Sequence, residues 1–324
     1  MRFRLVTLIG FVIAVTAIAV TSSRITFRYP PAVHETLVPK PASYLGVFEQ
    51  GTPPGTPPSY RSTEPFSDMA RAKPNLVAFY SGWAQPFNVS YATMLHSHGA
   101  IPLVQVDPSF ASVPAIAVGD YDTYLRSYAD SVRDYGHAVV IGFGHEMNGN
   151  WYSWGWGYKH TSPAAFKAAW RHIVTLFREE GAYNVTWLWT VNQMGRTGSR
   201  PICARWPGAN YVTWIGIDGY YVRRSDNFSS VFGSTINQVR AITGKPILLS
   251  ETGVSPKVLR FAAIEQIFNS IQSQNLLGVV WFDEYQPAQG LYRQDWRIEG
   301  HSPGDAQAQI AFQNGIAGLK IAHT

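Results

Sequence analysis

The sequence has a single cysteine, Cys203, among its 324 residues, so no disulfide can form within the chain. A cysteine nucleophile is not expected either, because no histidine lies near Cys203 in the sequence, although its basic neighbours favour a thiolate. The nine histidines form no His-Glu-x-x-His motif, and a second cysteine for Cys-x-x-Cys is missing. We therefore expect a fold held by core packing, with no catalytic metal and no cofactor.

Three further absences narrow the classes of function. The chain has no Gly-x-Ser-x-Gly elbow, which argues against an esterase or another serine hydrolase. Its 26 basic residues are dispersed and the formal net charge is only +5, so nucleic-acid binding is not expected. No repeat of fixed period is present, which argues against a solenoid or a propeller.

Short apolar runs of strand length recur along the chain. Eight of them are found, at Tyr44–Phe48, Leu76–Tyr80, Ile101–Val106, Ala138–Phe143, Val185–Thr190, Val212–Ile217, Pro246–Ser250 and Gly278–Phe282. Helix-like stretches separate most of them, which predicts parallel pairing and an α/β fold. Eight strands in a chain of this length predict a single-domain (β/α)8 TIM barrel.

Two of the intervening helices have clear sequence signals. One begins with Ser162 as N-cap and Pro163 at the first helical position, continues with apolar residues at three-to-four spacing, and stops at Gly181. Another is predicted from Val258 to Gln274. The connection from Gln193 to Asn210 lacks helical periodicity, so we expect a long loop there with at most a short helix.

The first residues resemble an export signal, and we expect them to lie outside the folded domain. Arg2 and Arg4 precede the apolar run Leu5 to Val20, so residues 1–23 are predicted to be a signal peptide, or an anchor over residues 5–23 if uncleaved. Residues 24–43 are predicted to be a proline-containing linker, and residues 44–320 the catalytic domain. The segment Gly51 to Pro58 is expected to form a stiff loop at the active-site rim, its alternative being a proline-rich ligand for a binding module. The protein is thus expected to be secreted or extracytoplasmic.

The most informative segment follows the fourth predicted strand. It runs from Gly142 to Gly155 and contains His145, Glu146 and Asn148 followed by aromatic residues. A carboxylate at the end of an apolar strand must find partners or be neutralised, because burying an unpaired charge is costly. In parallel barrels the active site lies at the carboxyl ends of the strands.

A second glutamate has the same placement. Glu251 follows the apolar run Pro246 to Ser250, 105 residues after Glu146 in the sequence, and so is expected at the same end of the barrel. Glycosidases that retain the anomeric configuration use two carboxylates roughly 5 Å apart. The two strand ends therefore predict a glycosidase pair.

Other polar and aromatic residues near strand ends are candidates for lining the pocket. The polar set is Glu49, Gln105, Asp107, Asn192, Asp218, Tyr220, Asp283 and Glu284. The aromatic set, suited to stacking on a sugar ring, is Trp83, Trp151, Trp154, Trp156 and Trp281, whereas Trp170, Trp187 and Trp189 are expected in the core. Each of these residues also has an ordinary structural role open to it.

The run His-Glu-Met-Asn-Gly followed by Trp-Tyr-x-Trp-Gly resembles glycoside hydrolase family 26, the β-mannanase family, and the resemblance extends from about Tyr44 to Tyr285. It implies Glu146 as general acid/base and Glu251 as nucleophile. Asp218-Gly219-Tyr220 matches the family's Asp-x-Tyr, which implies that Tyr220 orients the nucleophile. The resemblance also implies that His145 and Trp151 line the sugar subsite next to the scissile bond. Trp281 matches the family's tryptophan at the end of strand eight and is a further candidate for binding substrate.

The resemblance implies a retaining, endo-acting hydrolase whose substrate is a polysaccharide, with β-1,4-mannan first. Mixed-linkage β-glucan and β-1,3-xylan are alternatives with the same chemistry. An alternative of another class is a non-catalytic surface protein that binds carbohydrate. We further expect a monomer, with His145, Asn148, Trp156, Asp218, Trp83 and Asp107 among the residues that bind substrate.

Overall fold

The computed structural model describes residues 43–48, 59–158, 161–194, 201–286, 294–299 and 304–321. These ranges all belong to one compact unit that spans residues 32–324. The predicted signal, the linker over residues 24–42, Glu49 and the loop from Gly51 to Pro58 lie outside the described residues and stay predictions. Among the described residues, no helix has the length and apolar character needed to cross a membrane.

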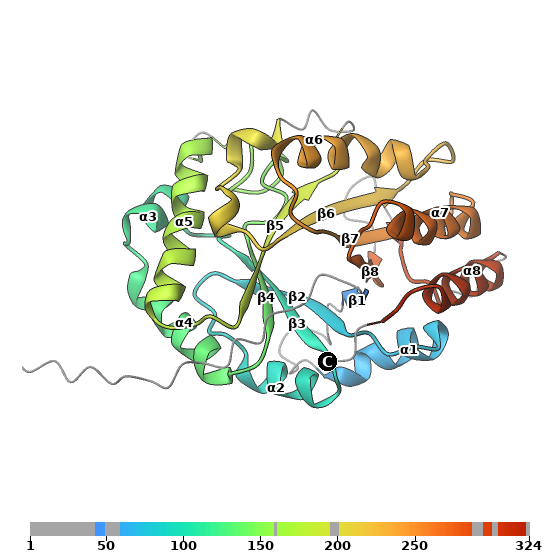
Figure 1. Cartoon of the computed structure of the whole chain (residues 1–324), viewed down its shortest axis with the longest axis horizontal. Coiled ribbons are helices and arrows are strands. Elements are labelled where there is room, and N and C mark those ends of the chain that lie inside the picture. The colour runs from blue at the N-terminus through green and yellow to red at the C-terminus, as the bar shows by residue number, and fades with distance from the viewer. Residues whose placement is uncertain are drawn as a thin grey trace, which may run out of the picture. The chain divides into compact units, whose positions relative to one another are not determined.

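Eight parallel strands form a closed barrel in chain order, and the last strand pairs with the first. They are β1 (Tyr44–Phe48), β2 (Leu76–Gly82), β3 (Ile101–Asp107), β4 (Val139–Phe143), β5 (Val185–Asn192), β6 (Trp214–Tyr221), β7 (Ile247–Val254) and β8 (Gly278–Phe282). Figure 1 shows them at the centre of a ring of helices. The TIM barrel predicted from the eight apolar runs is confirmed.

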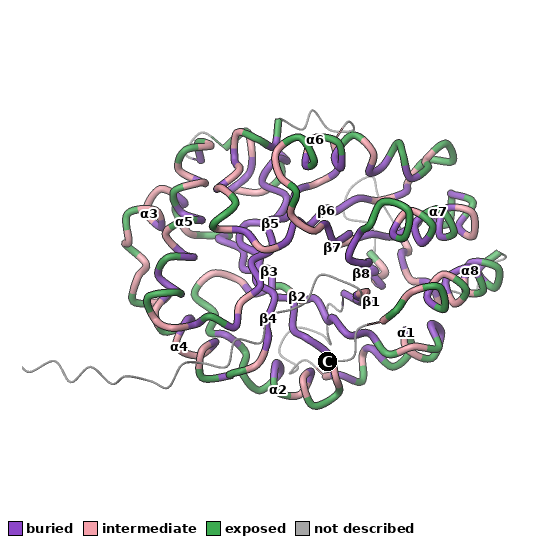
Figure 2. The backbone as a smooth tube through the Cα atoms, viewed as in Figure 1, coloured by how far each residue is buried: buried purple, intermediate pink, exposed green. Residues whose placement is uncertain are grey.

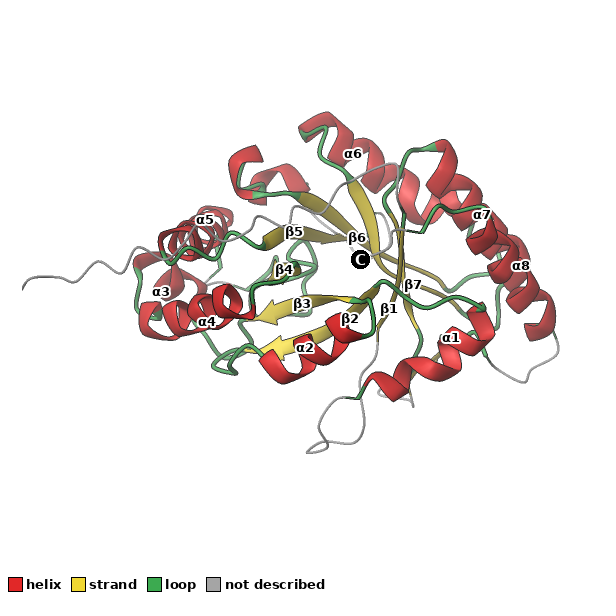
Figure 3. Ribbon diagram, turned by 60° about the horizontal axis from the view of Figure 1, so that its bottom comes forward, coloured by secondary structure: helices red, strands yellow, loops and turns green. Residues whose placement is uncertain are grey.

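The helices surround the strands (Figure 3). They are α1 (Glu64–Ala70), α2 (Val89–Ser97), α3 (Val113–Val118), α4 (Asp122–Tyr135), α5 (Pro163–Glu179), α6 (Ser234–Ile242), α7 (Arg260–Ser273) and α8 (Asp305–Ala317). A short hairpin, β9 (Tyr285–Gln286) with β10 (Gln294–Asp295), follows the eighth strand. The predicted cap of α5 is confirmed, because the Ser162 hydroxyl accepts a hydrogen bond from the Ala165 N–H at 3.1 Å.

The long connection between β5 and β6 contains two short 3-10 turns, η2 (Ile202–Arg205) and η3 (Ala209–Tyr211), in its described part. This agrees with the absence of helical periodicity in the sequence. After β6 a short helix of π type, η4 (Ser229–Gly233), leads into α6. A further 3-10 turn, η1 (Tyr60–Thr63), precedes α1.

Alternate strand residues enter two different cores. Leu45 and Val47 face outward and pack with helix residues such as Phe66, whereas Tyr44 and Phe48 belong to the cluster inside the barrel. Figure 2 shows the buried strands at the centre and the exposed faces of the helices around them. The three tryptophans expected in the core, Trp170, Trp187 and Trp189, are buried.

Polar side chains replace apolar ones inside the barrel toward the carboxyl ends of the strands. Gln105 donates to the Thr190 hydroxyl at 3.0 Å, and the Ser250 hydroxyl donates to Asp218 at 2.6 Å. Gly142 leaves room for this layer, because a Cβ there would lie 1.9 Å from the Gln105 side-chain oxygen. The layer supports the site above it with groups that can form hydrogen bonds.

Candidate active site

A cavity of about 510 Å³ lies over the carboxyl ends of the later strands. Its walls are Glu146, Trp151, Tyr152, Asn192, Gln193, Tyr220, Val222, Arg223, Glu251, Gln286, Gln294 and Trp296. The loop after β4, the ends of β5, β6 and β7, and the β9–β10 hairpin therefore build one pocket. Both predicted glutamates are in its wall.

A β-bulge positions Glu251. Between the pairs Gly216↔Leu248 and Asp218↔Glu251, β7 has one residue more than β6, and its pairing with β8 shifts at the same place. Leu248 is in the inner cluster and Leu249 in the outer one, yet both Ser250 and Glu251 contact inward-facing groups. The extra residue breaks the alternation and directs Glu251 into the pocket.

Two tyrosines donate hydrogen bonds to the Glu251 carboxylate. The Tyr220 hydroxyl donates to Oε1, and the Tyr80 hydroxyl donates to Oε2 at 2.6 Å. Burial, followed by the charge of Glu251, raises the pKa of Tyr220 well above its ordinary value, so this phenol keeps the proton that it donates. Both carboxylate oxygens thus have a fixed donor.

The pKa of Glu251 is raised above its ordinary value. Burial is the largest cause and the charge of Glu146 adds to it, while the charge of His145 and the hydrogen bonds from Tyr220 and Tyr80 oppose the shift. The tyrosines therefore favour the ionised form that burial disfavours.

Glu146 occupies a tight turn after β4. Its backbone has φ of 52°, an uncommon conformation for a residue with a side chain, and its N–H donates to the Thr190 carbonyl at 3.2 Å. The buried carboxylate accepts hydrogen bonds from the Asn192 amide at Oε1 and from the Trp151 indole at Oε2, the latter at 2.8 Å. These partners are what a carboxylate at a strand end requires.

Asn148, which was predicted to bind substrate, supports Glu146 through Asn192. Its amide donates to the Asn192 carbonyl at 2.8 Å, and its oxygen accepts from the Asn192 N–H at 2.8 Å. Asn148 is only 3% exposed, so its amide holds Asn192, which in turn contacts Glu146. Its contacts place it as a support of the acid and not in the pocket wall.

His145 is buried next to the glutamates. Its Nδ1 lies 2.8 Å from the Asp107 carboxylate and its Nε2 3.2 Å from the Tyr152 hydroxyl. Burial lowers its pKa, but the charge of Asp107 and its hydrogen bond, with the charges of Glu146 and Asp218, outweigh burial and raise the pKa to about 9. His145 is therefore a cation at neutral pH and balances the charge of the surrounding carboxylates.

Asp218 lies below the pocket and is 1% exposed. Burial, together with the charges of Glu251 and Glu146, raises its pKa well above the ordinary value, although the Ser250 hydrogen bond and the charge of His145 act in the opposite direction. This carboxyl consequently takes up a proton more readily than one in water.

The tryptophans predicted to stack on sugar rings lie in different environments in the structure. Trp151 is 39% exposed in the pocket wall, and Gly149 permits its position, since a Cβ on Gly149 would lie 2.4 Å from the indole ring. Trp281 is completely buried, and its indole donates to the Trp296 carbonyl at 3.0 Å. Trp281 thus holds Trp296, which is one of the aromatic residues in the pocket wall.

The other three tryptophans of the aromatic set are not in the described pocket wall. Trp154 is buried, and its indole donates to the His145 carbonyl at 2.7 Å. The Trp83 ring packs between Tyr121, Tyr124 and Phe143, with ring centroids 5.0 to 6.2 Å apart. The Arg205 guanidinium lies over the Trp156 ring at 5.1 Å. Asp107 is linked to the site by its hydrogen bond with His145.

Several residues of the site were not singled out as site residues from the sequence, namely Tyr80, which contacts Glu251, and the wall residues Tyr152, Gln193, Val222, Arg223, Gln286, Gln294 and Trp296. Tyr80 follows the same rule as the glutamates, since it lies toward the carboxyl end of β2, and that rule would have found it. Tyr152 lies within the motif after β4. Trp296 gave no signal, because it belongs to no predicted strand. In the part of the chain that the structure describes, no three His, Cys, Asp or Glu side chains are grouped so as to hold a metal ion.

Comparison with known proteins identifies relatives over most of the chain. The model of glycosyl hydrolase family 26 matches residues 118–290. Endoglucanase H of Acetivibrio thermocellus is 30% identical over 278 residues, which is 81% of this chain but 29% of that protein. Mannan endo-1,4-beta-mannosidase of Bacillus subtilis is 25% identical over 194 residues, which is 55% of this chain and 50% of the relative. The chain therefore spans half or less of the length of these two relatives.

Solved structures share the fold. A GH26 beta-mannanase from Bacteroides ovatus superposes with a TM-score of 0.61 at 18% identity, covering 87% of this chain and 90% of the other. A modular endo-beta-1,4-mannanase from Cellulomonas fimi gives a TM-score of 0.63 at 18% identity, covering 87% and 72%. At these identities the likeness concerns the barrel itself.

Proposed function

The chain belongs to glycosyl hydrolase family 26, and on this premise we propose that it is a retaining endo-β-glycosidase that cuts a polysaccharide with Glu146 and Glu251. The observation that carries the proposal is the pair of glutamates in one pocket, each with its own set of donors. Glu251 has a phenol on each oxygen, whereas Glu146 has an amide and an indole. Two carboxylates in different environments suit two different roles.

Glu251 is the nucleophile in this mechanism. Ionised Glu251 attacks the anomeric carbon, and a covalent glycosyl ester replaces the glycosidic bond. Tyr80 and Tyr220 hold the carboxylate and stabilise its charge through hydrogen bonds, which are stronger to an ionised acceptor. The His145 cation further favours ionised Glu251, because its charge lowers the pKa of that carboxyl.

Glu146 transfers the protons. It protonates the leaving glycosidic oxygen in the first step and deprotonates the attacking water in the second, so the anomeric configuration is retained. Asn192 and Trp151 keep its carboxyl group in place through both steps. Trp151, Tyr152 and Trp296 offer aromatic surface to the faces of the sugar rings.

The backbone that we propose as substrate is β-1,4-mannan. The mannanase relative and the family of the chain support it. A second candidate is a β-glucan, because the relative with 30% identity over 278 residues is named an endoglucanase. Residues 1–23 support export of the enzyme, with the segment either removed or retained as an anchor.

The test is product release from β-mannan, galactomannan, glucomannan, mixed-linkage β-glucan and β-1,3-xylan. Wild-type protein is expected to release oligosaccharides from at least one polymer, and Glu146→Gln and Glu251→Gln are each expected to abolish release while retaining the wild-type circular dichroism. Normal turnover by either variant would refute the assigned roles. Binding to a polymer that wild-type protein does not cut would instead indicate the non-catalytic carbohydrate-binding protein.

A further inference from the structure

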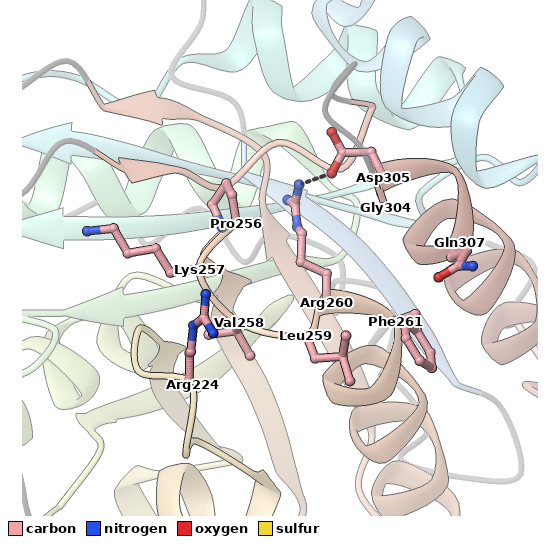
Figure 4. A pocket seen from close by; sticks show the side chains of 10 residues that line it. All are labelled: Arg224, Pro256, Lys257, Val258, Leu259, Arg260, Phe261, Gly304, Asp305 and Gln307. Carbon is pink, nitrogen blue, oxygen red and sulfur yellow. Dashed lines mark hydrogen bonds and ion pairs between the residues drawn. The ribbon is translucent and has the colours of Figure 1, made fainter.

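A second cavity, of about 500 Å³, lies at the same end of the barrel as the pocket with the glutamates. Figure 4 shows its side chains, which come from the loop after β6, the loop after β7 with the start of α7, and the start of α8. Loops at the carboxyl ends of the strands carry the function in barrels of this type, so a hollow there is in a position to bind a ligand.

The two cavities are neighbours. Arg223 is in the wall of the pocket with the glutamates, and the next residue, Arg224, is in the wall of the second cavity. Arg260 of the second cavity donates to the carbonyl of Trp296 at 3.4 Å, and Trp296 is in the wall of the first. The walls of the two cavities therefore adjoin at Arg223–Arg224 and at the contact between Arg260 and Trp296.

The second cavity has an excess of positive charge. It has three cationic side chains, Arg224, Lys257 and Arg260, and one carboxylate, Asp305. Asp305 neutralises Arg260 through a contact of 2.8 Å in which both side chains are buried (Figure 4). Arg224 and Lys257 are exposed, and the described residues give neither of them a carboxylate partner.

The cavity also has polar and apolar groups that fit a sugar acid. Leu259, which is 62% exposed, and Phe261 offer apolar surface beside the cations. The N-terminus of α8, which has no side-chain cap, adds its positive end.

A solvated cationic surface is the ordinary explanation for two exposed basic residues. It does not explain why both line one hollow with an apolar side, because like charges gathered in a concavity repel one another unless an anion joins them. An acidic sugar meets each of these features, with its carboxylate at the cations and its ring against the apolar surface.

We propose that this second cavity binds the carboxylate of a uronic acid unit of the glycan whose backbone is cut in the neighbouring pocket. That the uronic acid belongs to the glycan being cut rests on the proposed function. That the cavity binds an acidic sugar does not. The substrate class thereby becomes an acid-substituted β-glycan, and Arg224 and Lys257 determine the specificity for it.

The direct test measures saturation-transfer NMR signals of D-glucuronate, with D-glucose as the neutral comparison. We expect a stronger signal for glucuronate with wild-type protein and with Glu251→Gln, and loss of that difference in Arg224→Ala/Lys257→Ala. The matched control is Lys73→Ala/Lys245→Ala, which removes the same charge from the loops before β2 and β7, at the opposite end of the barrel. Equal signals for the two sugars with wild-type protein, or an unchanged difference in the Arg224/Lys257 variant, would overturn the proposal.

The kinetic test compares mannan with mannan in which a minority of the C6 groups has been oxidised to carboxylates. The Arg224/Lys257 variant is expected to raise KM for the oxidised polymer by about two- to fivefold, the size of an exposed ion pair, and to leave kcat and the values for neutral mannan unchanged. Equal KM changes on both polymers would contradict a carboxylate site. If neither polymer is cut while glucuronate still binds, the proposed activity on mannan fails and the acidic-sugar site stands.

Discussion

At the scale of single residues, the site depends on which of five neighbouring ionisable side chains carry a charge. Glu146, Glu251, Asp218 and Asp107 surround His145, whose pKa of about 9 makes it a cation at neutral pH. Hydrogen bonds from phenols to Glu251 act in the same direction as this cation. The His145 cation and the two phenol hydrogen bonds thus favour ionised Glu251, whereas burial, the largest single effect, disfavours it.

Removing the Tyr80 hydroxyl tests this balance. Its hydrogen bond lowers the pKa of Glu251, so Tyr80→Phe raises that pKa and moves the acidic limb of the pH–rate profile to higher pH. Loss of a hydrogen bond to a charged group predicts a fall in kcat of about ten- to a hundredfold. The measurement is the pH dependence of kcat/KM beside that of Tyr158→Phe, at an exposed tyrosine. An unmoved acidic limb would show that Tyr80 does not act on the nucleophile.

Asp218 has a predicted cost to stability that depends on pH. The pKa of Asp218 is raised in the folded protein. The stability that this carboxyl contributes is therefore fully present below pH 3.8, its pKa in the unfolded chain, and is lost as pH rises through its pKa in the folded protein. Asp218→Asn removes this loss, so its melting temperature should exceed that of wild type by a few degrees at pH 8, with the difference shrinking toward pH 4. Asp120→Asn, at an exposed carboxylate, is the control. A difference that grows toward low pH would contradict the stated sign.

At the scale of elements, the strands could be predicted from the sequence, whereas the geometry at the ends of the strands could not. Gly278–Phe282 and Tyr44–Phe48 were predicted with their observed bounds, because both runs are continuously apolar and an acidic residue follows each of them. The bulge that directs Glu251 inward was not predictable, since an extra residue in β7 is visible only against its neighbours β6 and β8. The same holds for the contact between Tyr80 and Glu251, which joins residues 171 positions apart.

The loop after β4 is the element whose packing controls Glu146. Gly149→Ala places a methyl group against the Trp151 ring and is expected to displace the indole from Glu146, lowering kcat/KM by at least about tenfold through loss of a charge-assisted contact. Gly244→Ala is the matched control, because a Cβ there meets no atom within 4 Å. Steady-state kinetics and melting temperatures of both variants make the comparison. Equal activity of the two variants would mean that the indole contact is dispensable.

At the scale of the whole molecule, the barrel separates stability from chemistry. Apolar clusters fill its interior and the space between strands and helices, while polar groups gather toward the carboxyl ends of the strands. Sequence reasoning found this division from strand-end residues such as Glu146 and Glu251. It did not separate tryptophans of the wall from supporting ones, since Trp151 and Trp281 both lie beyond or at strand ends while only Trp151 is exposed.

The most direct test of the two-glutamate mechanism is the anomeric configuration of the first product, followed by NMR while wild-type protein cuts a soluble polymer from the panel. Double displacement predicts that the β-anomer appears first and the α-anomer only later by mutarotation, with no product from Glu251→Ala. Initial release of the α-anomer, or unchanged release by Glu251→Ala, would contradict the assignment of Glu251 as a nucleophile paired with Glu146.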